Sequence, residues 1–93
     1  MKLSIVIPAF NEAATIERVL DRISESVSHF HEVIVVDDAS TDQTAARVEN
    51  RARVDPRIRL FHHKQNAGKT AALRTGFAAV TGDLVVVQDA DLE

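Results

Sequence analysis

Four short, largely β-branched apolar runs alternate with three longer segments of helical periodicity along this 93-residue chain. The runs cover residues 3–7, 33–36, 58–61 and 84–87, and the first, second and fourth are almost continuously apolar. Strands of that kind are expected where helices cover both faces of a sheet. Because helical crossovers favour parallel pairing, the alternation predicts an α/β fold of three αβα layers, with a mostly parallel sheet in the order β-α-β-α-β-α-β.

The first two helical segments carry recognisable start and stop signals. Asn11 stands in the position of an N-cap for the first helix, whose apolar face has helical spacing and consists of Ile16, Val19, Leu20, Ile23 and Val27. Ser40 and Gln43 fit a capping box for the second helix. That helix is expected to end before Pro56.

The third helical segment is expected to begin near Gly68-Lys69. Its many alanines and Gly76 would permit a close approach to the sheet. Its apolar spacing is carried by Leu73, Phe77 and Val80.

Composition limits the class of protein. A chain of this length with 45% hydrophobic residues forms one domain, and a net charge of -3 argues against nucleic acid as a partner. The absence of cysteine excludes disulfides and is compatible with the cytoplasm. The apolar start is interrupted by Pro8 and is shorter than the roughly 20 residues of a membrane span, so no membrane segment is expected.

A polar cluster follows each expected strand. The clusters are Asn11-Glu12, Asp37-Asp38, 66–69 and 89–91. In open α/β sheets, ligands bind outside the carboxyl ends of the strands. The four clusters are therefore expected to converge on one edge of the sheet and to form one site there.

Asp89 and Asp91 are one residue apart at the end of the last strand. In an extended chain both side chains lie on the same side, so both can reach one ion, and the small Ala90 leaves room for a ligand. Carboxylates suit Mg²⁺ or Mn²⁺, which often share their coordination with substrate phosphates. The alternative is a pair of solvated acidic residues in a loop.

Asp37 and Asp38 follow the second strand directly, where a carboxylate can accept a hydrogen bond from a ribose or a base. The alternative is stabilisation of the next helix through its dipole. In the loop 66–70, Gly68 can let the backbone approach an anion and Lys69 can meet a phosphate. Because His63 stands where a P-loop needs glycine, a Walker-type NTPase is not expected.

Glu12 and the two adjacent histidines carry weaker signals. Glu12 on its own is typical of a charge in the first turn of a helix. His62 and His63 would point to opposite faces of a strand. We therefore interpret them as polar residues at a strand end and not as a chelating pair.

Taken together, residues 5–12, 33–42, 66–69 and 81–91 resemble the donor half of the family 2 inverting glycosyltransferases. The ending 88–93 resembles the branch of polyprenyl- or dolichol-phosphate mannosyl- and glucosyltransferases. The resemblance implies a truncated GT-A fold with a Rossmann-like sheet. It also implies that residues 1–93 are a single nucleotide-sugar-binding (donor) half and that the acceptor half is absent.

The resemblance also implies residue roles. Pro8, Phe10 and Glu12 would line the base and ribose pocket, with Phe10 in place of a frequent Tyr. Asp38 and Asp37 would bond the base and Lys69 would lie near the phosphates. The full expected binding set is Pro8, Phe10, Asn11, Glu12, Asp37, Asp38, Gly68, Lys69, Asp89 and Ala90, with Asp89 and Asp91 as ligands of Mg²⁺ or Mn²⁺. No catalytic base is assigned, because the family's motif for it would lie beyond Glu93.

The implied reaction is transfer of a hexose from GDP-mannose or UDP-glucose to an acceptor such as polyprenyl phosphate, with inversion and metal assistance. The fragment itself is expected only to bind the donor, in the cytoplasm, at the cytoplasmic face of a membrane in the full-length protein. Two alternatives stay open, a haloacid-dehalogenase-like phosphotransferase using 89–93 and a non-catalytic nucleotide-binding module. Exposed edge strands would favour a homo-oligomer.

Overall fold

The computed structural model describes residues 1–27 and 29–91. Within them, four strands, β1 (Leu3–Ala9), β2 (Glu32–Asp37), β3 (Ile58–His62) and β4 (Leu84–Val87), alternate with three helices, α1 (Ile16–Ser26), α2 (Thr44–Val54) and α3 (Lys69–Ala79). The predicted order of elements is confirmed. No helix in this part of the chain has the length and apolar character needed to cross a membrane.

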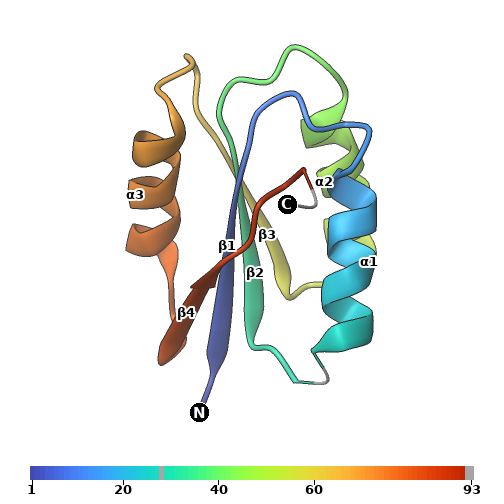
Figure 1. Ribbon diagram of the computed structural model, residues 1–93, viewed down its shortest axis with the longest axis vertical. Helices are drawn as coiled ribbons and strands as arrows, with labels where there is room; N and C mark the ends of the chain where they lie inside the picture. Colours follow the sequence, from blue (N-terminus) through green and yellow to red (C-terminus); the bar gives the residue numbers. More distant parts are fainter. Residues whose placement is uncertain (28, 92–93) are drawn as a thin grey trace.

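The strands form one parallel sheet in the order β3-β2-β1-β4. Figure 1 shows α3 on one face and α1 and α2 on the other, which confirms the three-layer α/β prediction. From β1 the chain places β2 and β3 on one side and β4 on the other. The strand order therefore reverses beside β1, and in open α/β sheets such a switch point forms a ligand crevice at the carboxyl ends of the strands.

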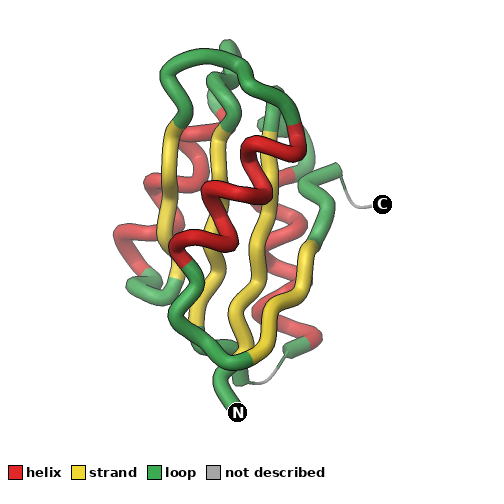
Figure 2. Tube along the Cα trace, turned by 90° about the vertical axis from the view of Figure 1, so that its left-hand side faces the viewer, coloured by secondary structure: helices red, strands yellow, loops and turns green. Residues whose placement is uncertain are grey.

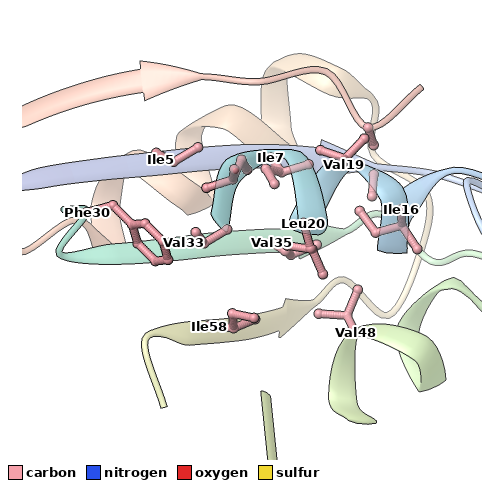
Figure 3. Close-up of a cluster of buried hydrophobic side chains, with 13 residues drawn as sticks. Ile5, Ile7, Ile16, Val19, Leu20, Phe30, Val33, Val35, Val48 and Ile58 are labelled. Atoms are coloured by element: carbon pink, nitrogen blue, oxygen red, sulfur yellow. The ribbon is translucent and has the colours of Figure 1, made fainter. Parts of the chain in front are cut away.

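Apolar cores lie on both faces of the sheet because successive strand residues point to opposite sides. Figure 3 shows the larger core, between the sheet and helices α1 and α2. It includes Ile5, Ile7, Ile16, Leu20, Val33, Val35 and Val48. The core under α3 is built from Val6, Ile34, Val36 and Ala72. The two cores hold β1 and β2 rigidly at the centre of the sheet.

Helix α3 approaches the sheet through its smallest residues. A Cβ atom added at Gly76 would overlap Cγ1 of Val6, so the predicted close approach is confirmed. Ala72 and Gly76 form the buried face, and Leu73 and Val80 pack beside it. The inclusion of Phe77 in the apolar face was wrong, because its side chain is 48% exposed.

Both cap predictions were also wrong. Helix α1 begins at Ile16 with Thr15 in the N-cap position, and α2 begins at Thr44 after Gln43. Asn11, at φ 53°, instead accepts a hydrogen bond at Oδ1 from the Thr41 amide (2.8 Å). Ser40 Oγ accepts one from the Asn11 amide (2.9 Å). The two loops after β1 and β2 therefore satisfy each other's polar groups before either helix begins.

Strand β4 departs from the expectation that continuously apolar strands are covered on both faces. Its four residues, Leu84 to Val87, are 42–50% exposed. β4 pairs with β1 at the edge of the sheet, and α3 packs on β1 and β2. An apolar sequence therefore marked a strand correctly but did not reveal its edge position.

Candidate functional site

A pocket of about 230 Å³ opens at the carboxyl ends of the strands. Figure 2, with α3 in front of the sheet, shows the loops that follow β1, β2 and β3 gathered at that end. The pocket is lined by Pro8, Ala9, Phe10, Glu12, Asp38, Lys69, Ala72, Asp89, Ala90 and Asp91. Eight of these residues were predicted from the sequence. Ala9 and Ala72 were missed because small apolar residues carry no chemical signal.

The predicted residues Asn11, Asp37 and Gly68 are not among the lining residues. Asn11 ties the two loops together, as described above. Asp37 is buried, its Oδ1 has no hydrogen-bond partner, and its Oδ2 lies 3.6 Å from Nδ1 of His62. Gly68, at φ 94°, occupies the N-cap position of α3 and donates its amide to Asp38. Asn11 and Gly68 thus support the pocket through hydrogen bonds without lining it.

The carboxylate of Asp38 is held by three donors. Oδ1 accepts hydrogen bonds from the Ala67 amide (2.9 Å) and from Nδ1 of His63 (2.8 Å), and Oδ2 accepts one from the Gly68 amide (2.8 Å). Burial acts to raise the pKa of Asp38, but these bonds outweigh it and the pKa lies below its usual value. An ionised carboxylate offers about four acceptor positions, so Oδ2 keeps acceptor capacity beside the pocket.

His63 is a site residue whose role the sequence did not reveal. Its Nε2 lies 2.7 Å from Oγ1 of Thr75 on α3, while Nδ1 faces Asp38. Because a carboxylate only accepts, Nδ1 carries the proton in the neutral ring and Nε2 accepts from the Thr75 hydroxyl. His62 faces Asp37 and Glu49 instead, so the two rings have different partners. The position of His63 after a strand was the only available signal.

The pocket also carries a dense group of charges. Nζ of Lys69, at the start of α3, lies 3.1 Å from Oδ1 of Asp89 in the turn after β4. Burial raises the pKa of Glu12, and the nearby carboxylates of Asp91 and Asp42 raise it further. Among the lining residues, Glu12, Asp89 and Asp91 thus add three carboxylates to the pocket and Lys69 adds one ammonium group. This combination suits a cation together with an anionic ligand.

Within the described residues, no group of three or more His, Cys, Asp or Glu side chains could by itself hold a metal ion. Magnesium does not require such a cage, because it is usually bound by one or two carboxylates together with substrate phosphates and waters. Asp89 and Asp91 offer oxygen donors of that type at the pocket. The residues therefore fit a divalent cation that arrives with a phosphate ligand. Leu92 and Glu93, part of the expected motif, lie outside the described residues.

The fold and the pocket define a Rossmann-like α/β domain with its ligand site at a switch point of the sheet. A family model described as glycosyl transferase family 2 matches residues 4–93. The chain belongs to this family, and both the family resemblance and the GT-A fold predicted from the sequence are confirmed. The match favours the glycosyltransferase interpretation over the haloacid-dehalogenase-like alternative.

Three relatives illustrate the similarity. The dolichyl-phosphate beta-glucosyltransferase ALG5C of Trichomonas vaginalis is 40% identical over 94 residues, covering 92% of this chain and 28% of the relative. The mannosyltransferase PcManGT from Pyrobaculum calidifontis, solved with GDP-Man and Mn²⁺, has a TM-score of 0.87 and 38% identity over 97% of this chain and 27% of its own.

The third is glucosyl-3-phosphoglycerate synthase from Mycobacterium tuberculosis, solved with Mn²⁺, UDP and glucosyl-3-phosphoglycerate. It has a TM-score of 0.75 and 40% identity over 96% of this chain and 33% of its own. The chain thus spans about a third or less of the length of these relatives.

Proposed function

We propose that residues 1–93 are the donor-binding half of a glycosyltransferase and bind a nucleotide-diphosphate sugar in the pocket beside β1. One observation carries the proposal: Asp38, Lys69 and the Asp89-Ala90-Asp91 turn, far apart in sequence, line a single pocket at the switch point of the sheet. Such a donor requires three elements: a hydrogen-bond acceptor for its base, a cationic side chain for its phosphates, and a pair of carboxylates for the metal ion.

Each lining residue has a role suited to its chemistry. The half-exposed ring of Phe10, beside Pro8, offers a surface on which a base can stack. Oδ2 of Asp38 accepts a hydrogen bond from the base, and Glu12 lies where the ribose would enter. Lys69 contacts a phosphate as a point charge. Asn11 and Gly68 contribute by holding the loops that carry these side chains in place.

Asp89 and Asp91 would hold Mg²⁺ or Mn²⁺ in the D-x-D motif. When bound, the cation offsets the charge of the departing diphosphate. Two solved relatives contain Mn²⁺ together with GDP-Man or UDP, which supports a divalent cation and makes Mn²⁺ the first to test. Lys69 would exchange its bond with Asp89 for one with a phosphate when the donor binds.

For the whole protein we propose metal-assisted, inverting transfer of a hexose from GDP-mannose or UDP-glucose to a lipid phosphate acceptor. The support for the acceptor class is the name of a relative, which specifies dolichyl phosphate. Such an acceptor would place the full protein at the cytoplasmic face of a membrane. We assign no general base in this chain, and we expect the chain alone to bind the donor without transferring sugar.

The test is isothermal titration calorimetry of the 93-residue chain with GDP, UDP and their mannose and glucose conjugates, in Mn²⁺, in Mg²⁺ and in EDTA. We expect dissociation constants of about 0.1 to 1 mM, equivalent to roughly −5.5 to −4 kcal/mol, and weaker binding in EDTA. The better nucleotide identifies the donor base. Heat signals that are the same with and without every nucleotide would refute the proposal.

A further inference from the structure

Thr15 occupies the N-cap position of α1, yet its side chain makes no hydrogen bond to the helix. A threonine in this position usually accepts a bond from an amide of the first turn, which stabilises the helix by about 1 kcal/mol. Here Oγ1 instead donates a hydrogen bond to the carbonyl oxygen of Ala90 at 2.6 Å. The hydroxyl is therefore directed away from its own helix and toward a residue 75 positions later in the chain.

Ala90 is the middle residue of the Asp89-Ala90-Asp91 turn. It is 3% exposed and packs in the larger apolar core. A backbone carbonyl in such a place needs a hydrogen-bond partner, and Thr15 provides one. The preceding attachment of this segment to the sheet is the bond from the Gln88 amide to the Val6 carbonyl (3.0 Å). The Thr15 bond thus fixes the backbone between the two carboxylates, beyond the end of β4.

We propose that Thr15 is a positioning residue for the cation and diphosphate part of the pocket; this inference rests on the proposed function. Its hydroxyl fixes the turn so that Asp89 and Asp91 both face the pocket. The base side of the pocket is held independently, because Asp38 is anchored by His63, Ala67 and Gly68. Loss of the hydroxyl should therefore weaken metal-dependent binding and leave metal-independent binding unchanged.

The substitution Thr15→Val removes the hydroxyl and keeps the shape of the side chain, while Thr15→Ser keeps the hydroxyl. GDP and UDP are titrated into each variant in Mn²⁺ and in EDTA. We expect Thr15→Val to reduce affinity about tenfold in Mn²⁺, as loss of a group that supports metal ligands typically does, with a change of less than about twofold in EDTA. Thr15→Ser should bind like the unsubstituted chain in both conditions.

A second measurement follows Mn²⁺ directly. Paramagnetic broadening of the Asp89, Ala90 and Asp91 amide signals in NMR spectra should require more Mn²⁺ in Thr15→Val than in Thr15→Ser. If Thr15→Val does not fold, Thr15→Ala compared with Thr15→Ser provides the same test.

Three results would overturn the inference in distinguishable ways. Equal Mn²⁺-dependent affinities in Thr15→Val and Thr15→Ser would show that the hydroxyl does not position the turn. An equal loss in Mn²⁺ and in EDTA would indicate a general structural role. Failure of the unsubstituted chain to bind any nucleotide would refute the proposed function itself, and the inference with it.

Discussion

Nζ of Lys69 lies 3.1 Å from Oδ1 of Asp89, so the lysine of the pocket is paired with a carboxylate of the same pocket. The pair joins the start of α3 to the turn after β4. Both side chains are well exposed, and pairs of this kind contribute at most about 1 kcal/mol to folding. The lysine is therefore available to a stronger anion at little energetic cost.

Replacing Lys69 with methionine should weaken nucleotide-diphosphate binding and hardly change stability. We expect calorimetry to show about a tenfold loss of affinity for GDP or UDP, since the phosphate loses its contact with the lysine ammonium group. The free energy of unfolding should stay within about 1 kcal/mol of the original value. Lys64→Met is the matched control, because Lys64 is an exposed lysine outside the pocket lining. Equal effects of the two substitutions would exclude a phosphate contact for Lys69.

Asp38→Asn should both destabilise the chain and reduce nucleotide binding. An amide cannot accept at both oxygen positions, so it leaves one donor among Ala67, Gly68 and His63 without a partner. An unsatisfied buried group costs about 1 to 3 kcal/mol, which urea unfolding would measure. Asp37→Asn is the control: Asp37 is buried with one oxygen unpartnered, so neutralising it should change stability by less than about 1 kcal/mol. A larger loss in Asp37→Asn than in Asp38→Asn would contradict this view of the two aspartates.

Glu32, at the start of β2 and far from the pocket end of the sheet, should make the stability of the fold sensitive to acid. Burial acts to raise its pKa, but hydrogen bonds from the Thr81 amide, the Ser4 hydroxyl and the Arg59 guanidinium lower the pKa to about 2. Because the folded pKa lies below the ordinary value of 4.5, Glu32 stabilises the fold fully above about pH 4.5. That stabilisation, about 3 kcal/mol by linkage, is lost as the pH falls toward 2.

The measurement is urea unfolding from pH 6 to pH 2 of the original chain and of Glu32→Gln. The substituted chain should be less stable at pH 6 and show a flatter loss of stability between pH 4.5 and 2. Glu25→Gln, an exposed position on α1, serves as the control and should follow the original profile. Parallel profiles for Glu32→Gln and the original chain would rule out this assignment.

The exposed apolar edge strand β4 predicts self-association of the isolated chain. Its four residues carry no charge, and charges are a common protection of edge strands. Light scattering should show species larger than a monomer at high concentration, and Val86→Lys should shift them toward monomer. Val54→Lys, a substitution of an exposed valine on α2, should have no such effect. A monodisperse monomer at all concentrations would argue against association through β4.

The order of the elements, the parallel sheet and most of the pocket-lining residues could be predicted from the sequence. Apolar runs and helical periodicity are local patterns, and the connection rules of parallel sheets then bring strand ends together. Asp38 follows β2 directly, Asp89 comes two residues after the end of β4, and Lys69 begins the helix after β3. All three lie beyond the carboxyl end of a strand, so their meeting at one edge could be inferred without coordinates.

How those residues are held could not be predicted from the sequence, because it depends on contacts between distant segments. Asn11 and Ser40 were expected to cap helices and instead bond across two loops, Thr15 leaves its helix for Ala90, and His63 joins Asp38 to α3. Each of these bonds joins two elements distant in sequence and depends on where the packed layers bring their ends. Short-range patterns record the local preferences of a side chain, whereas the partner that it finally takes is set by the fold.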